Sequence, residues 1–237
     1  MSVTDHFGAP PVTAVGPSVI TGERGTMLRP LRVKICGITR EEDARVAADL
    51  GAWAVGFIFW PGSARAIDAR HARDIVRALP PFVMPIGVFV DQPADEIEEV
   101  ASTVRLGAVQ LHGGERPDMA RSLSYPVIKA VPIDVQGHAL GLDDWPDTLV
   151  LLDAHDPVRR GGTGRPIDWH AAAAIARQRP IVLAGGLTPE NVAQAVVQVR
   201  PAAIDVSSGV ESAPGIKDHA RMRALFASVA AATGVVQ

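Results

Sequence analysis

Two side chains that could transfer protons each stand at the end of a short apolar run. Cys36 ends the run at 31–36, and Asp153 ends the run at 148–153. A thiolate, which a nearby helix N-terminus favours, can act as a base, whereas a lone cysteine in an apolar strand is most often a small buried hydrophobe. Burial would raise the pKa of Asp153 toward the range of a general acid, although a helix cap or a salt bridge explains this residue equally well. Together the two residues indicate acid–base chemistry.

Three glycine-containing clusters indicate an anion-binding site. They are GGTG at 161–164, GG at 185–186 and SSG at 207–209. Glycine lets backbone N–H groups approach an anion closely, and a helix N-terminus adds a favourable partial charge. Any one cluster could instead simply end an element, but three neighbouring loops favour phosphate binding. Neither GxxxxGK[ST] nor GxGxxG occurs, which argues against a nucleoside triphosphate or a dinucleotide. The candidate phosphate-binding residues are Gly162, Thr163, Gly164, Gly185, Gly186, Ser208 and Gly209.

Other charged residues near these motifs have less specific signals. Arg65 lies in a loop with Ser63, where its guanidinium could bind a carboxylate through two hydrogen bonds, or where it could be a solvated loop arginine. Lys34 shares a strand face with Cys36 and is better read as an internal charge partner than as a Schiff-base amine. The seven histidines show neither HxxxH nor HExxH spacing, so no metal site is predicted.

The elements that would position these residues form a regular alternation. Short apolar runs alternate with stretches of helical period, and runs that are apolar throughout are typical of parallel strands covered on both faces. Eight such units in about 205 residues predict a single (β/α)8 TIM barrel, rather than an open doubly wound sheet of five or six strands. The runs span 31–36, 54–59, 83–90, 108–112, 127–131, 148–153, 181–185 and 203–207.

The boundaries of this barrel follow from the same pattern. Residues 1–28 contain several prolines and no periodic pattern, and are expected to form a flexible N-terminal extension; residues 29–237 would form the barrel. The segment after the fifth run, with Pro132, Gly137 and Gly141, has the weakest helical pattern. Thr39 and Glu42 have the spacing of a capping box at the start of the first helix. In such a barrel, active sites lie at the carboxyl ends of the strands, where Asp91, Gln110, His112 and Lys129 are also found.

Composition excludes several classes of partner. The formal net charge is -3 and no run of five or six like charges occurs, so binding to nucleic acid or to an anionic membrane surface has no electrostatic support. No apolar stretch reaches the roughly 18 residues that a membrane span needs. The single cysteine cannot form an intrachain disulfide, and a cytoplasmic location is therefore expected.

Eight motifs resemble one known family. They are KICGIT at 34–39, SAR at 63–65, GVFV at 87–90, VQLHG at 109–113, LLDA at 151–154, GGTG at 161–164, LAGGLTPENV at 183–192 and DVSSGVESAPGIKD at 205–218. In this order, from about residue 31 to the C-terminus, they are similar to phosphoribosylanthranilate isomerases of tryptophan biosynthesis. Ala64 stands where the family usually has proline or a polar residue.

The resemblance implies a specific reaction and specific roles. The reaction is the Amadori rearrangement of N-(5-phosphoribosyl)anthranilate to the 1-deoxyribulose 5-phosphate, with Cys36 as general base and Asp153 as general acid. Arg65 would bind the anthranilate carboxylate and the glycine loops the phosphate, while Gln110, His112 and Asn191 would shape the pocket. The resemblance implies no cofactor and no metal, a small phosphosugar as the only partner, and a monomer or homodimer.

Two alternative functions stay open from the sequence. One is another phosphosugar barrel: indoleglycerol-phosphate synthase, ribulose-phosphate epimerase, or a histidine-pathway or dual-substrate isomerase. A histidine-pathway isomerase would be expected to have aspartate in place of Cys36, and a synthase would have lysine and glutamate catalysts. The other is a non-catalytic phosphosugar-binding barrel, which the presence of both Cys36 and Asp153 disfavours.

Overall fold

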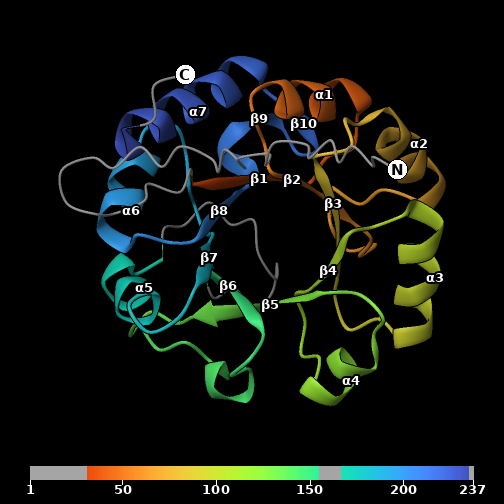
Figure 1. Cartoon of the computed structure of the whole chain (residues 1–237), viewed down its shortest axis with the longest axis horizontal. Coiled ribbons are helices and arrows are strands. Elements are labelled where there is room, and N and C mark those ends of the chain that lie inside the picture. Colours follow the sequence, from red (N-terminus) through yellow and green to blue (C-terminus); the bar gives the residue numbers. More distant parts are fainter. Residues whose placement is uncertain (1–30, 155–166, 235–237) are drawn as a thin grey trace, which may run out of the picture.

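A closed barrel of eight parallel strands forms the centre of the molecule (Figure 1). The computed structural model describes residues 31–154 and 167–234; the expected extension at 1–28 and the GGTG cluster at 161–164 lie outside these ranges. Each strand pairs with its neighbours in chain order, and β8 closes the ring on β1. The predicted (β/α)8 barrel is therefore confirmed. The strands are β1 Arg32–Cys36, β2 Ala54–Ile58, β3 Met84–Phe89, β4 Ala108–Leu111, β5 Val127–Ile133, β6 Leu149–Ala154, β7 Ile181–Leu183 and β8 Ala203–Val206.

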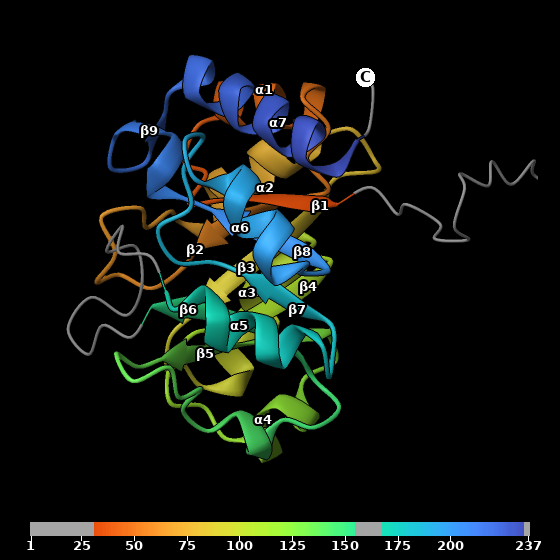
Figure 2. The ribbon, with the colours of Figure 1, turned by 90° about the vertical axis from the view of Figure 1, so that its left-hand side faces the viewer.

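Helices surround the barrel on its outside (Figures 1 and 2). They are α1 Glu41–Asp49, α2 Ala69–Ala78, α3 Ala94–Val104, α4 Pro117–Ser122, α5 Trp169–Ala176, α6 Val192–Val199 and α7 His219–Thr233. After β5 the chain forms only the 3-10 turn Leu142–Asp144, where Gly137 and Gly141 adopt positive φ angles. The weak helix prediction for that segment is wrong. Within 31–154 and 167–234, no helix has the length and apolar character to cross a membrane.

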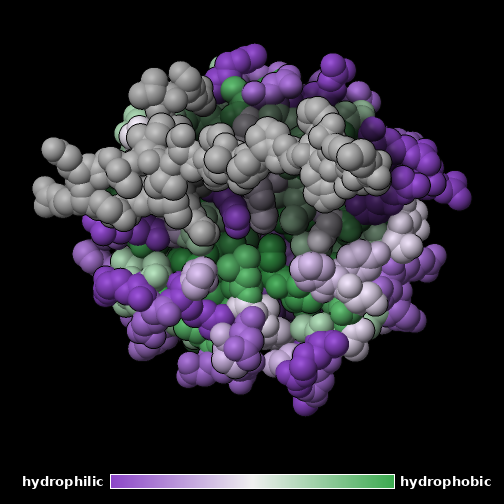
Figure 3. All heavy atoms as spheres, in the orientation of Figure 1, coloured by the Kyte–Doolittle hydropathy of each residue, from purple (hydrophilic) through white to green (hydrophobic). Residues whose placement is uncertain are grey.

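Two apolar clusters form the core. The larger one lies between the strands and the helices and includes Phe57, Phe89 and Leu152. The smaller one consists of residues such as Ile86, Ala108 and Leu151, which alternate along the strands with members of the larger cluster. Because side chains alternate between the two faces of a strand, this smaller cluster lies inside the barrel. Figure 3 shows apolar side chains gathered at the centre of one face, ringed by hydrophilic residues.

A hairpin that the sequence did not predict follows β8. Its strands are β9 Glu211–Ala213 and β10 Ile216–Lys217, paired antiparallel. The predicted capping box at Thr39 is wrong because this hairpin takes the side chain: the Thr39 hydroxyl donates to the Gly215 carbonyl, and α1 is preceded by Arg40 without a side-chain cap. The hairpin thereby packs beside the end of β1.

Candidate active site

The predicted proton-transfer residues both occupy inward-facing positions near the carboxyl ends of their strands. Asp153 lies two residues after Leu151 of the inner cluster, and Cys36 lies two residues after Lys34, which pairs with Ala54 of that cluster. Gly56 pairs with Cys36, and a Cβ at Gly56 would lie 2.8 Å from the Cys36 sulfur. The absence of a side chain at Gly56 therefore leaves space for the thiol inside the barrel.

The Cys36 thiol lies among charged groups. It is buried, with 5% of the residue exposed. Burial and the nearby Asp205 carboxylate raise the pKa of Cys36, and the ammonium groups of Lys34 and Lys217 lower it by less. The expectation that a helix N-terminus would favour the thiolate is wrong, because α1 begins only at Glu41 and desolvation dominates.

Asp153 lies beside His112 at the carboxyl ends of β6 and β4. The His112 Nε2 is 3.3 Å from the Asp153 Oδ2, and both side chains are mostly buried. The Asp153 Oδ1 accepts a hydrogen bond from the Ala154 backbone at 2.8 Å. Gln110, two residues before His112 on the same face, contacts the His112 Nδ1 at 3.0 Å through its Nε2. The structure thus brings Gln110, His112 and Asp153 together, as the sequence predicted.

Lys34 joins this group from β1. Its ammonium donates to the Gln110 Oε1 at 2.9 Å and to Asp205 of β8 at 3.0 Å. Burial alone would lower the pKa of Lys34, but the Asp205 carboxylate and the other acceptors outweigh burial and raise it. The prediction of an internal charge partner is confirmed, and Asp205 is a site residue that the sequence reasoning missed. Its position two residues after the inward-facing Ala203 was the signal available.

Arg65 is held by a carboxylate of the hairpin. Its Nε and Nη2 donate to the Glu211 carboxylate at 2.9 and 2.7 Å, and Lys217 donates to the same group at 2.7 Å. Burial alone would raise the pKa of Glu211, but the hydrogen bonds and charges of Arg65 and Lys217 hold it below its usual range. Lys217 also donates to the Cys36 carbonyl at 2.6 Å, so this cluster lies against the end of β1.

The two glycine clusters within the described ranges meet at one pocket. This pocket has a volume of about 310 Å³ and is lined by Gly186, Thr188, Ser208, Gly209, Glu211 and Arg221. A Cβ at Gly209 would overlap the Leu187 carbonyl oxygen, so only glycine allows the two loops to lie this close. Arg221, whose Nε donates to the Gly209 carbonyl at 2.9 Å, was not found by the sequence reasoning.

Asn191 stabilises the loop between β7 and α6. Its Oδ1 accepts from the Thr188 backbone at 2.8 Å, and its Nδ2 donates to the Gly186 carbonyl at 2.9 Å. The structure therefore shows Asn191 bonding to the backbone of this loop at Gly186 and Thr188. Gly185, in the same loop, adopts a positive φ, and a Cβ there would lie 3.2 Å from the Asp153 Oδ1, so this loop also passes close to Asp153.

Two other polar residues at strand ends lie outside this group. Lys129 alternates with the inward-facing Ile128 and Ala130, so it points away from the barrel interior, where it pairs with Glu115 at 2.8 Å. Asp91 accepts a hydrogen bond from the Gly114 backbone.

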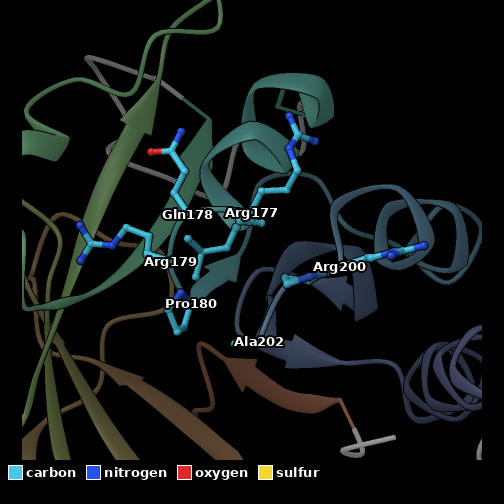
Figure 4. Close-up of a pocket in the computed structure, with 9 residues that line it drawn as sticks. Arg177, Gln178, Arg179, Pro180, Arg200 and Ala202 are labelled. Carbon is cyan, nitrogen blue, oxygen red and sulfur yellow. The ribbon is translucent and has the colours of Figure 1, made fainter. Parts of the chain in front are cut away.

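A further pocket, of about 350 Å³, lies at the opposite end of the barrel (Figure 4). Arg177 and Arg179 precede β7, and Arg200 precedes β8. Their guanidinium groups point away from one another in Figure 4, so they do not converge on a ligand. The amino-terminal end of a barrel is also not where active sites of this fold lie. The candidate active site is therefore the carboxyl-terminal end.

Comparisons with known proteins agree with this geometry. A family model of N-(5'-phosphoribosyl)anthranilate (PRA) isomerase matches residues 33–228. The N-(5'-phosphoribosyl)anthranilate isomerase of Trichlorobacter lovleyi is 47% identical over 194 residues, which cover 81% of this chain and 95% of that protein. The crystal structure of phosphoribosyl anthranilate isomerase from Thermotoga maritima is 43% identical, covers 85% of this chain and 99% of its own, and superposes with a TM-score of 0.80.

A second solved structure contains a ligand. It is a phosphoribosyl anthranilate isomerase in complex with reduced 1-(o-carboxyphenylamino)-1-deoxyribulose 5-phosphate; it is 42% identical, covers 85% of this chain and 99% of its own, and has a TM-score of 0.77. The family model and the two solved structures match nearly the whole barrel of this chain. The chain therefore belongs to the N-(5'-phosphoribosyl)anthranilate isomerase family and is an aldose–ketose isomerase of tryptophan biosynthesis.

Proposed function

We propose that Cys36 is the general base and Asp153 the general acid in the Amadori rearrangement of N-(5'-phosphoribosyl)anthranilate. The observation that carries this proposal is that both residues occupy inward-facing positions at the carboxyl ends of β1 and β6. Lys34 lies beside Cys36 next to Gly56, and Gln110 and His112 connect Lys34 to Asp153. A thiol and a carboxyl group at one barrel mouth supply the two proton transfers that the rearrangement needs.

The first transfer opens the sugar ring. Asp153, in its protonated form, donates its proton to the ring oxygen while the bond between C1′ and that oxygen breaks and the anilinic nitrogen supplies its lone pair to C1′. The products are a carboxylate and an open-chain iminium ion. The Ala154 N–H and the His112 imidazole, which lie at the two oxygens of Asp153, stabilise the carboxylate that forms.

The second transfer removes the hydrogen at C2′. The iminium ion acidifies this hydrogen, and the Cys36 thiolate takes it as a proton, so that the electron pair forms the C1′–C2′ double bond of an enolamine. Tautomerisation of the enolamine gives the ketone. A raised pKa makes the thiolate scarcer but a stronger base, and the Lys34 and Lys217 ammonium groups favour the thiolate. Each transfer is expected to contribute roughly 10²- to 10⁴-fold in rate.

Binding groups at either end of the substrate would fix it between acid and base. Glu211 accepts from the Nε and Nη2 of Arg65, and the Nη1 of the guanidinium would donate to the anthranilate carboxylate. Backbone N–H groups at Gly185, Gly186, Ser208 and Gly209 would bind the phosphate, together with Gly162, Thr163 and Gly164 from outside the described ranges. Gln110 and His112 orient the acid, and Asn191 supports the phosphate loop.

Complementation tests this assignment in the cell. A tryptophan auxotroph that lacks this isomerisation step is transformed with the wild type, with Cys36→Ser, or with Arg177→Ala as a control at the opposite end of the barrel. The wild type and Arg177→Ala are expected to restore growth without tryptophan, and Cys36→Ser is not. Growth of the Cys36→Ser strain at the wild-type rate would contradict the assignment of the base.

A further inference from the structure

A chain of polar contacts crosses the inside of the barrel from β1 to β6. The Lys34 Nζ lies 2.9 Å from the Gln110 Oε1, and the Gln110 Nε2 lies 3.0 Å from the His112 Nδ1. The His112 Nε2 then lies 3.3 Å from the Asp153 Oδ2. Lys34 and Gln110 are 2% and 1% exposed. Because water has little access to these two residues, each must satisfy its polar atoms through the others.

The direction of each contact follows from the first residue. An ammonium group has three donors and no acceptor, and Lys34 is held in this form by Asp205 at 3.0 Å. Lys34 therefore requires the amide oxygen of Gln110 to face it. The amide NH₂ of Gln110 then faces the Nδ1 of His112. Because an NH₂ group can only donate, Nδ1 must be the ring nitrogen that accepts.

The tautomer of His112 is then determined. A neutral imidazole with Nδ1 as acceptor has its proton on Nε2. A doubly protonated ring would set an N–H against the NH₂ of Gln110, which costs a buried hydrogen bond and adds a donor without an acceptor. The Nε2–H consequently points toward the Asp153 Oδ2. Its distance of 3.3 Å is long, as is common for catalytic contacts that tighten when substrate binds.

This tautomer controls where the acidic proton of Asp153 can go. With a hydrogen on Nε2, the imidazole has no lone pair that faces Asp153 and cannot take the proton of the carboxyl group. The opposite tautomer would present a lone pair to Asp153 and would compete with the ring oxygen of the sugar for that proton. The Ala154 N–H at 2.8 Å donates to the other carboxyl oxygen, so neither neighbour accepts the acidic proton of Asp153, and this proton is left for the substrate.

We propose that Lys34 and Gln110 are positioning residues which fix His112 as the neutral Nε2–H tautomer, so that Asp153 gives its proton to the sugar ring and not to the imidazole. This inference rests on the proposed role of Asp153 as general acid. It assigns to Lys34 and Gln110 an effect on turnover through two intermediate side chains, and to His112 the role of a hydrogen-bond donor and not of a proton acceptor.

The test is to read the tautomer directly and then reverse it. Two-bond proton–nitrogen NMR spectra of the full-length ¹⁵N-labelled protein, with His112 assigned by its loss in His112→Gln, distinguish protonated from unprotonated ring nitrogens. The wild type is expected to show Nε2 protonated and Nδ1 unprotonated. In Gln110→Glu a carboxylate faces Nδ1, so the tautomer is reversed: Nδ1 becomes protonated and Nε2 presents its lone pair to Asp153. The value of kcat is then expected to fall on the order of 10²- to 10⁴-fold, with KM within about threefold of the wild type.

Two further variants keep the proposal falsifiable if Gln110→Glu does not fold. The amide NH₂ of His112→Gln reaches the place of Nε2, whereas that of His112→Asn reaches the place of Nδ1. Because only the former can donate to Asp153, kcat of His112→Gln is expected to exceed that of His112→Asn on the order of tenfold. Equal kcat values, or the reverse order, would overturn the inference.

Asp153→Asn separates this inference from the proposed function. If that variant turns over at nearly the wild-type rate, Asp153 is not the acid and both proposals are overturned. If it loses turnover but the wild-type spectrum shows the proton on Nδ1, only the inference about the tautomer is overturned. A spectrum that changes in Gln110→Glu without a change in kcat would overturn it as well.

Discussion

Replacing Glu211 by glutamine would remove the charge that holds two cations in place while keeping the shape of the side chain. The Glu211 carboxylate accepts from Arg65 at 2.7 to 3.1 Å, from Lys217 at 2.7 Å and from the Gly215 backbone at 3.3 Å. Its side chain is 5% exposed, that of Lys217 is 0% and that of Arg65 is 15%. Glu211→Gln therefore leaves two mostly buried cations near one another without their shared counter-charge.

The expected cost has two parts. Breaking a buried ion pair by removing one partner costs about 3–5 kcal/mol, and the lower end applies because the glutamine oxygen still accepts from one cation. Unfolding free energies of about 5–15 kcal/mol for a domain leave the variant folded at that cost. Release of Arg65 would also remove the proposed charge-assisted contact to the substrate carboxylate, worth about 1.5–3 kcal/mol, so KM is expected to rise roughly 10- to 150-fold.

The assay combines urea unfolding with steady-state kinetics on the full chain. Affinity is measured for the product and for an analogue in which a phenyl ring replaces the carboxyphenyl ring. Glu211→Gln is expected to bind the product more weakly and the analogue as the wild type does. Glu115→Gln is a matched control, because Glu115 pairs with Lys129 at 2.8 Å and is 2% exposed, but lies outside the barrel interior. It should lose similar stability with unchanged KM.

Two results would refute this account of Glu211. An unchanged KM in Glu211→Gln would show that Arg65 does not depend on Glu211 for its position. Equal loss of affinity for the product and for the phenyl analogue would show that Arg65 does not bind the carboxylate.

Three shorter predictions concern the rest of the barrel. Arg65→Ala should weaken affinity for the substrate more than for inorganic phosphate, and equal losses would place Arg65 at the phosphate. Gly209→Ala should lower phosphate affinity at least about tenfold, measured by competitive inhibition, because the new Cβ would overlap the backbone of Leu187. In the control Gly51→Ala the new Cβ would meet nothing within 4 Å, so the variant should lose only about 1 kcal/mol of stability. Burial alone would raise the pKa of Asp43, but hydrogen bonds from Arg40, the Lys217 backbone and His219 hold it below 3.8. The contribution of ionised Asp43 to the free energy of unfolding is therefore complete above about pH 4 and is lost as pH falls through the folded-state pKa. Unfolding measured at decreasing pH should show stability falling more steeply in the wild type than in Asp43→Asn.

The barrel could be predicted because its strands are local features. Each is a short run that is apolar throughout, and alternation of side chains then places Gln110, His112 and Asp153 on the inward face. The segment after β5 could not be predicted as well, since Gly137 and Gly141 take positive φ angles there. In place of an α-helix, this segment contains the 3-10 turn Leu142–Asp144.

The parts of the site that the sequence did not predict depend on contacts between distant residues. Arg65 and Glu211 are 146 positions apart, and the hairpin that carries Glu211 has only short strands with little apolar pattern. Thr39 has the spacing of a cap, but its hydroxyl bonds to Gly215 instead. The rise in the pKa of Cys36 similarly comes from burial and from Asp205, neither of which is visible from the neighbours of Cys36 in the sequence.

Turnover of Cys36→Ser and Asp153→Asn, each compared with its affinity for the product, tests the assignment of acid and base most directly. Loss of one proton-transfer group should lower kcat at least about 100-fold, while the dissociation constant of the product stays near the wild-type value because the carboxylate and phosphate contacts are kept. Near wild-type kcat in either variant would contradict the account.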